Sequence, residues 1–196
     1  MDYLLDLLQG LGIAAAIGIR PFLPTLLAGA LAAADLGLDF ENTDFSFLEE
    51  PVFLLAIVVL VAIFGVIDRR RGADTSGRGP VVAFLIAATL VLGALEACGS
   101  IADRSSDWWP GLIVGTLAAA LGFAAARSLF ARVKARLDPE AQGALPLFAE
   151  GAALIGAGLS VLFPPLAVLV VAALAWLLLG GRRRQGEKYA GLRILR

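Results

Sequence analysis

The chain has 196 residues, of which 59% are hydrophobic and only 17% are charged, with a net charge of −1 and a mean hydropathy of +0.85. Ordinary soluble domains are about 45–50% apolar and about 25% charged, and a soluble core of this size could not bury so much apolar surface. The composition therefore excludes an ordinary soluble domain and predicts an all-α, polytopic bundle of transmembrane helices. No basic patch indicates a nucleic-acid partner.

Several chemistries are excluded by missing residue types. Histidine is absent, and Cys98 is the single cysteine. Histidine is the commonest general base and metal ligand, so a zinc hydrolase or a Ser-His-Asp enzyme is excluded. A single cysteine forms no intramolecular disulfide. Because no phosphate-binding loop, CxxC or paired-carboxylate spacing is found either, we expect no enzyme, no metal site and no cofactor.

The first apolar stretch, residues 3–36, is interrupted by Gly18-Ile19-Arg20-Pro21-Phe22-Leu23-Pro24. Proline lacks the amide proton that a helix needs and collides with the preceding turn, so Pro21 and Pro24 predict a break or a sharp kink. A bilayer core of about 30 Å needs roughly 20 helical residues. The stretch therefore forms either one tilted span with an interfacial N-terminal piece or two short helices hinged at Arg20 to Pro24.

The rest of the chain alternates apolar runs with polar turns. An acidic and aromatic loop at 38–50 is expected to lie against the headgroups, and Trp108 and Trp109 fit an interfacial aromatic belt. Polar connections are expected at 72–79 and 103–110. The expected spans cover residues 51–67, 80–102, 111–130, 145–163 and 166–179.

Most of the sixteen Lys and Arg residues fall in the segments 69–79, 132–140 and 182–196. Positive charge marks cytoplasmic loops, so these segments, including a basic tail at 182–196, are expected on the cytoplasmic side. Residues 1–19 contain no Lys or Arg, which favours an outside N-terminus. The pattern predicts one transmembrane domain over 1–181 with seven crossings, and six remain the alternative.

Three pairs of segments look alike, which is consistent with an internal duplication. Residues 3–67 and 109–181 would form two three-helix repeats in parallel orientation, joined by the linking span 80–102; in transporters the substrate site often lies between such repeats. Helices rich in Ala, Leu and Gly also resemble each other without duplication, so both explanations stay open. The pairs are 51–71 with 165–184, 23–30 with 145–152, and 14–18 with 118–122.

Four ionisable residues lie in or beside apolar runs: Arg20, Glu96, Arg127 and Glu150. An unpaired charge at the bilayer centre would cost about 2.5 to 3.5 kcal/mol on insertion scales. We expect Glu150 to lie near Arg20 or Arg127 on the cytoplasmic side and Glu96 to lie near the outer end. Arg20 either marks a cytoplasmic turn or faces a polar cavity, and an Arg–Glu pair there would be a structural clamp or an ion-binding gate.

Small residues predict close helix contacts. Gly111 and Gly115 have GxxxG spacing, and Gly151, Gly156, Gly158 and Ser160 lie along one predicted helix. Such faces let helices approach closely within one chain. They would equally suit a protomer interface, so a homo-oligomer is one expected partner state beside membrane lipids.

The Arg20-Pro21-Phe22-Leu23-Pro24 break, the Phe47-Leu48 entry to Pro51, and the Leu147-Phe148-Ala149-Glu150 stretch leading to Pro164-Pro165 resemble a family of bacterial integral membrane proteins. The family is known as domain of unknown function 4126. The resemblance implies a multi-spanning inner-membrane protein and supplies no catalytic residues. Members often carry an acidic residue followed by lysine where this chain has Asp68 and three arginines, which leaves the role of that position open.

Two functions fit these observations. The broken first segment, the candidate repeats and the in-membrane Arg and Glu residues favour a small transporter or channel for an ion or small solute. The alternative is a structural or accessory membrane protein that binds lipid or protein partners through its small-residue faces and its basic rim, which would attract anionic headgroups at about 1 kcal/mol per residue.

Overall fold

The protein is described from a computed structural model that covers residues 2–71, 79–102, 104–105 and 107–190. Within these ranges the structure is all-α and has no strand, as predicted. The helices are α1 (Asp2–Ile19), α2 (Phe22–Ala32), α3 (Pro51–Arg71), α4 (Pro80–Ala102), α5 (Trp109–Lys134), α6 (Pro139–Gln142), α7 (Leu145–Leu162) and α8 (Leu166–Ala190), with a 3₁₀ turn, η1, at Ser46–Leu48.

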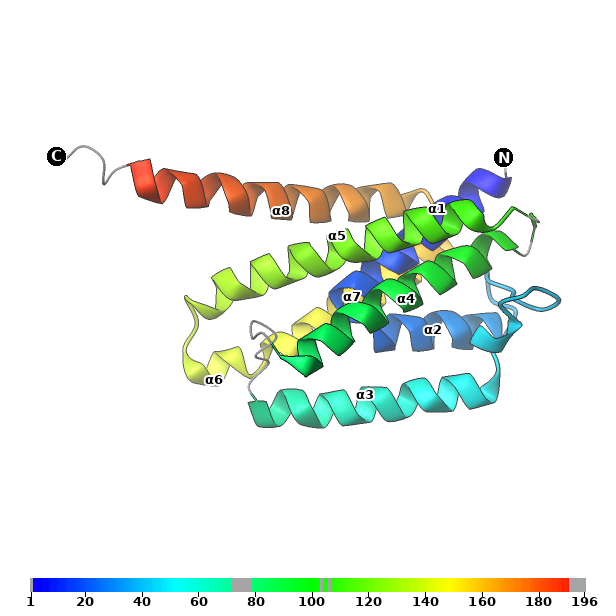
Figure 1. The fold of residues 1–196 in the computed structure, drawn as a ribbon, viewed down its shortest axis with the longest axis horizontal. Coiled ribbons are helices and arrows are strands. Elements are labelled where there is room, and N and C mark those ends of the chain that lie inside the picture. Colours follow the sequence, from blue (N-terminus) through cyan, green and yellow to red (C-terminus); the bar gives the residue numbers. More distant parts are fainter. Residues whose placement is uncertain (1, 72–78, 103, 106, 191–196) are drawn as a thin grey trace.

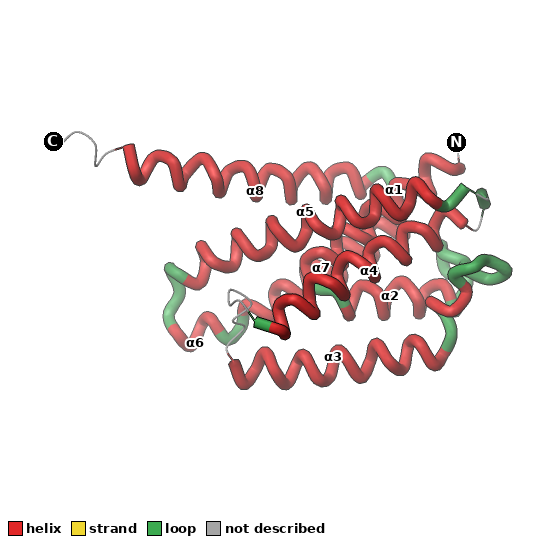
Figure 2. Tube along the Cα trace, viewed as in Figure 1, coloured by secondary structure: helices red, strands yellow, loops and turns green. Residues whose placement is uncertain are grey.

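Successive long helices run in alternate directions along the long axis of the molecule, so the start of α1 and the end of α8 lie toward opposite ends (Figure 1). Most of the described loops gather at these two ends, whereas the turn between α1 and α2 lies inside the bundle (Figure 2). In the described part of the chain, three helices, α4, α5 and α7, are long and apolar enough to cross a membrane. Shorter apolar segments lie in the other long helices, at Tyr3–Ile19, Phe22–Ala32, Pro51–Ile67 and Leu166–Gly180.

Several helix boundaries match the sequence predictions, and the C-terminal one does not. Helices α3 and α4 begin at Pro51 and Pro80 as expected. The segment 182–196 was predicted as a separate basic tail, but α8 continues without interruption to Ala190. Arg, Gln, Glu and Lys are good helix formers, so a charged sequence can extend a helix beyond its apolar part. The predicted linker at 72–78 and residues 191–196 lie outside the described residues.

Helix α1 lies at the centre of the bundle. It packs against α2, α4, α5, α7 and α8, and the side chains from Ile13 to Ile17 are fully buried. The predicted GxxxG face also packs within the chain: a Cβ on Gly115 would lie 2.5 Å from the carbonyl oxygen of Gly93 on α4, and one on Gly111 would lie 2.6 Å from that of Ala97. Close backbone approach thus forms the core where larger side chains would form it in a soluble protein.

The crossing of α1 and α5 is reciprocal. A Cβ on Gly18 would lie 2.5 Å from the Ala119 carbonyl oxygen, and a Cβ on Gly122 would meet the carbonyl oxygen of Ala15. These are matching positions of the sequence pair 14–18 and 118–122. Segment 14–18 of the first candidate repeat therefore contacts segment 118–122 of the second. Helices α3 and α8, which end the two candidate repeats, lie at opposite edges of the molecule (Figure 1). Duplication of 3–67 and 109–181 as whole units stays a prediction.

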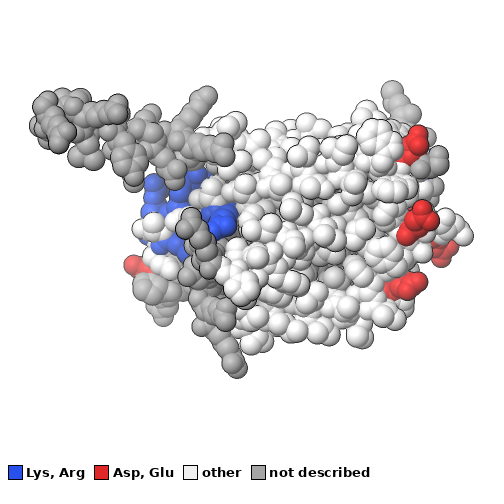
Figure 3. Space-filling model, in the orientation of Figure 1, with Lys and Arg blue, Asp and Glu red and all other residues white. Residues whose placement is uncertain are grey.

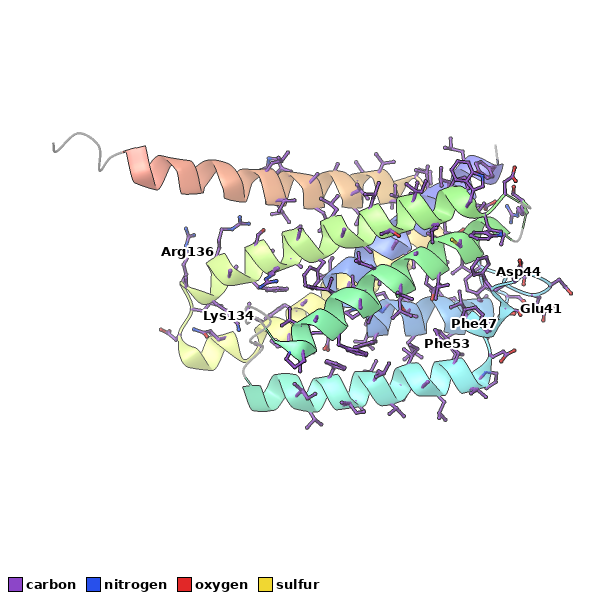
Figure 4. All side chains as sticks on the ribbon, viewed as in Figure 1. Glu41, Asp44, Phe47, Phe53, Lys134 and Arg136 are labelled. Atoms are coloured by element: carbon purple, nitrogen blue, oxygen red, sulfur yellow. The ribbon has the colours of Figure 1, made fainter. Side chains whose placement is uncertain are left out.

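The acidic loop at 38–50 folds back onto the bundle. Phe40 and Leu48 are fully buried and pack where Gly99 on α4 leaves space. Phe45 lies edge-on to Trp108, with ring centroids 5.6 Å apart, and Phe47 packs against Phe53 (Figure 4). Phe40 and Phe45 thus face inward, Glu49 is partly buried and accepts a hydrogen bond from the Phe40 amide, and Glu41, Asp44 and Glu50 are exposed. That the loop lies against the headgroups stays a prediction.

The outer helices present apolar side chains to the surroundings. Helix α3 packs against α2. The ring of Phe64 on α3 is stacked on that of Phe84 and tilted against that of Phe22, while Val52 is 77% exposed. On α8, Trp176 is 75% exposed. A perimeter of this kind is unfavourable in water and suits hydrocarbon.

Candidate functional site

Charge is separated between the two ends of the molecule. Figure 3 shows described Lys and Arg side chains at the end where α5 finishes and, apart from one patch, Asp and Glu side chains at the opposite end. Lys134 and Arg136 lie at the first end and Glu41 and Asp44 at the second (Figure 4). We call these the basic end and the acidic end. The visible surface between them carries neither kind of charge.

The predicted break, at Arg20 and Pro21, lies inside the bundle on the side of the basic end. Gly18, just before it, packs against Ala119 and Gly122, about three turns before α5 ends at Lys134. Helix α1 closes with the Arg20 amide donating to the Ala16 carbonyl at 3.2 Å, and α2 begins at Phe22. The Thr25 hydroxyl donates to the Pro21 carbonyl at 2.8 Å. Two short helices are thus confirmed, and a single tilted span is wrong. Pro24 makes no second break, because it lies in the first turn of α2, where its missing amide proton has no intrahelical acceptor.

A crevice of about 50 Å³ opens beside this break, between the α1–α2 corner, α4, α5 and the start of α7. Its cationic lining residues are Arg20, Arg127 and Lys134, and Thr89 of α4 lines it as well. We call it the basic crevice. Of the two predicted roles, Arg20 therefore has the second: it lines a cavity. Arg127 lines the same crevice.

Glu150 lies on the other side of Arg20. A second crevice, of about 30 Å³, is lined by Arg20, Pro21, Phe64 and Glu150. Glu150 and Arg20 thus line the same crevice, as expected. Arg127 lines only the first crevice, on the other side of Arg20. Whether Arg20 and Glu150 form a clamp or a gate stays a prediction.

Glu96 is separate from this cluster. It lies on α4 near the acidic end of the helix, is 0% exposed, and neither carboxylate oxygen has a hydrogen-bond partner among the described residues. Buried carboxyl groups are almost always hydrogen-bonded or paired. A group that is neither, inside an apolar helix bundle, is a candidate functional residue.

Glu96 belongs to a polar stripe along α4. Thr89, Glu96 and Ser100 are all buried, and their spacings of seven and four residues place them on one face of the helix. At about 1.5 Å per residue, Glu96 lies about 10 Å from Thr89 and about 6 Å from Ser100 along the axis. Thr89 lines the basic crevice, and Ser100 lines a pocket at the acidic end. The two outer residues of the stripe thus line separate cavities, one toward each end of the bundle, and Glu96 lies between them.

The acidic-end pocket is the larger, at about 290 Å³. Asp6 and Arg104 line it and form an ion pair at 3.4 Å, and Gln9 donates to the Gly37 carbonyl at 2.6 Å. In the adjacent loop, partial burial raises the pKa of the Glu49 carboxyl, although the hydrogen bond from the Phe40 amide opposes this shift. Within the described ranges, no three Cys, Asp or Glu side chains form a metal-binding cluster.

Sequence reasoning identified Glu96 but missed Thr89, Ser100 and the pair of Asp6 with Arg104. The spacing of Thr89, Glu96 and Ser100 was a visible signal, because three polar residues recur on one face of an apolar helix. Asp6 and Arg104 are 98 residues apart, and no local pattern links them.

The apolar perimeter and the three helices long enough to cross a bilayer support the class of α-helical membrane proteins. The family model described as domain of unknown function (DUF4126) matches residues 7–184. The chain therefore belongs to this family, which confirms the resemblance noted in the sequence. No curated protein and no solved structure is detectably similar to it.

Proposed function

We propose that this protein is a small transporter or channel of the bacterial inner membrane, without enzymatic activity, and that the polar stripe of α4 forms its pathway. The chain crosses the membrane seven times, with the acidic end outside and the basic end and C-terminus in the cytoplasm. The alternating helix directions (Figure 1) and the separation of charge between the ends (Figure 3) support this arrangement through the positive-inside rule.

The observation that carries the proposal is the buried carboxyl group of Glu96. A buried polar group without a partner destabilises a protein by about 1–3 kcal/mol. Membrane proteins use such groups as ion or proton sites. Glu96 lies between a crevice at one end and a pocket at the other, with one hydroxyl residue toward each. We infer that a proton or small cation binds Glu96 as it passes between the two ends.

The test is a flux assay in sealed liposomes that contain the purified protein and an internal pH-sensitive dye. A potassium gradient with valinomycin imposes a membrane potential, and proton entry is compared between wild type, Glu96→Gln and Glu49→Gln. Glu96→Gln keeps the shape and removes the titratable group, while Glu49→Gln makes the same change in the loop. We expect flux in wild type and Glu49→Gln and none above background in Glu96→Gln. Wild-type flux equal to that of empty liposomes, for protons and for alkali cations, would contradict the proposal.

The alternative function, a structural or accessory protein that binds lipid, is favoured by the basic crevice. Lys134 lies at the end of α5, at the depth where phospholipid headgroups are found in our proposed orientation, and Arg127 and Arg20 lie about two and three helical turns deeper. This function predicts co-purified anionic lipid together with no flux. Measuring proton flux and bound lipid on the same purified protein therefore distinguishes the two functions.

A further inference from the structure

We propose that the basic crevice is a binding site for a phosphate group, carried either by an anionic lipid headgroup or by a free phosphate anion. This inference does not require transport. It shares only Thr89 with the proposed pathway, and it concerns a different ligand at a different depth from Glu96.

The first support is the convergence of positive charge from separate elements. Arg20 follows the end of α1, Arg127 lies on α5, and Lys134 is the last residue of α5, about two turns further on. All three line one crevice of about 50 Å³. Each also has interactions within the protein. Three cations around one small space favour an anion there, and guanidinium groups match the geometry of phosphate oxygens.

The second support is the hydroxyl group of Thr89. Inside helices, Ser and Thr commonly donate to the carbonyl four residues earlier, and Ser100 and Ser160 do so here at 2.9 and 2.7 Å. Thr89 is equally buried, at 1% exposure, but its hydroxyl has no hydrogen-bond partner among the described residues. Because Thr89 lines the crevice and its buried hydroxyl lacks a partner among the described residues, we assign this hydroxyl to the site as the donor that a ligand oxygen would recruit.

The third support is the direction of two helices. Pro21, directly before α2, and Leu145 and Pro146, the first residues of α7, line the same crevice. The N-terminus of a helix carries a partial positive charge and attracts anions. The fields of α2 and α7 therefore add to those of the three side chains.

The size of the crevice limits the ligand. About 10–15 Å³ is enough to hold one water molecule, so about 50 Å³ admits a group of several heavy atoms. Glu150, in the adjoining crevice, repels an anion that extends past Arg20. A single phosphate group fits these limits better than a larger polyanion.

The test uses Cys98 as a reporter of unfolding. Cys98 is buried, so a thiol-reactive fluorophore labels it only when the protein opens. Melting curves of the full chain in detergent are recorded with increasing inorganic phosphate against sodium chloride of equal ionic strength. A second series adds phosphatidylglycerol or phosphatidylcholine to the detergent. Ligand binding to the folded state raises the melting temperature until the site is saturated.

The variants are Arg127→Gln, Lys134→Gln and Thr89→Val, with Arg136→Gln as the matched control. Arg136 is an exposed cation at the same end and is not part of the crevice lining. Thr89→Val removes the hydroxyl without changing the net charge, so it separates a built site from general surface attraction. Each crevice variant is expected to weaken binding by about tenfold, roughly the loss of one charge-assisted hydrogen bond. Arg136→Gln is expected to bind as wild type. Should Thr89→Val fail to fold, Thr89→Ala replaces it.

A saturable shift with inorganic phosphate identifies a free anion as ligand. A shift with phosphatidylglycerol alone, and not with phosphatidylcholine, identifies a headgroup. Either result supports the site if the crevice variants reduce the shift. The proposal is overturned if wild type responds to neither ligand, or if Arg136→Gln loses as much of the response as the crevice variants. Binding without proton flux would keep this site and remove the transport proposal.

Discussion

The two ends of the bundle hold different polar structures. The acidic end has a wide pocket of about 290 Å³, a loop folded over the helix ends, and an ion pair that links α1 to the segment after α4. The basic end has two narrow crevices, of about 50 and 30 Å³, on either side of Arg20. Between them, the polar side chains of α4 form the stripe that includes Glu96.

This difference indicates different tasks for the two ends. A wide pocket holds water, and its charges are well screened. A narrow crevice holds few waters, so its cations and its hydroxyl act on a ligand in a medium of lower dielectric constant, where electrostatic interactions are stronger. Selective binding is therefore expected at the basic end and free exchange with water at the acidic end.

The largest expected effect comes from the helix crossing beside the basic crevice. Gly122→Ala places a methyl group against the Ala15 carbonyl and 2.9 Å from the Gly18 Cα. Overpacking of this kind costs about 1–3 kcal/mol or more, and it would push α5, which carries Arg127, away from Arg20. We expect a lower melting temperature and loss of phosphate-group binding. The matched control is Gly151→Ala, which meets nothing within 4 Å and should stabilise α7 slightly, by about 0.5–1 kcal/mol. Equal melting temperatures of the two variants would contradict the described crossing.

The next effect concerns the region between the ends. Glu96→Met replaces an unpartnered carboxyl by an apolar side chain of similar size. Removal of a buried unsatisfied group should stabilise the protein by about 1–3 kcal/mol, while it abolishes flux. Denaturant or thermal unfolding of the detergent-solubilised protein measures the first change, and the liposome assay measures the second. A destabilised variant would indicate that Glu96 has a structural partner instead.

A smaller effect is expected at the acidic end. The side chain of Arg104 is 59% exposed, whereas that of Asp6 is only 9% exposed. Ion pairs with an exposed member contribute about 0.2–1 kcal/mol and weaken in salt. A double-mutant cycle with Asp6→Asn and Arg104→Gln should therefore give a coupling energy below about 1 kcal/mol that falls as salt is added. A coupling that does not change with salt would mean that the pair is shielded from water.

The smallest effect belongs to Glu49. Its pKa is raised in the folded state, mainly by burial, so the folded protein holds this proton to a higher pH than the unfolded chain does. The stabilising contribution is complete below the unfolded pKa of about 4.3 and is lost as the pH rises through the folded pKa. The melting temperature of Glu49→Gln should be slightly higher than that of wild type at neutral pH. The two melting temperatures should be equal near the unfolded pKa. If Glu49→Gln melts below wild type at neutral pH, the pKa of Glu49 is lowered in the folded state and not raised.

The sequence predicted the features that depend on local chemistry. The break at Arg20 and Pro21 follows from proline's missing amide proton, and the starts of α3 and α4 follow from proline's preference for the first helical turn. The matching Ala-Ala-Ala-x-Gly segments of α1 and α5 were visible as a possible repeat, but their contact with each other was not predicted. The charge segregation that separates the two ends was visible in the loops.

The features that the sequence did not predict depend on tertiary contacts. The spacing of Thr89 relative to Glu96 was visible in the sequence, but its place on the crevice wall depends on how α4 packs against α5 and the α1–α2 corner. The inward turn of Phe40 depends on space above Gly99, which lies in another helix. The pairing of Asp6 with Arg104 depends on how α1 and α4 align at the acidic end.

The polar stripe itself is tested most directly by cysteine accessibility. In a Cys98→Ser background, single cysteines at Thr89 and Ser100 are treated with a small charged methanethiosulfonate reagent in right-side-out and inside-out membrane vesicles. Our account predicts that Thr89→Cys reacts from the cytoplasmic side and Ser100→Cys from the outside, and that the same reagent reaches neither from the opposite side. If neither position reacts from either side, the stripe is dry and closed, and Glu96 does not lie on a pathway between the two ends.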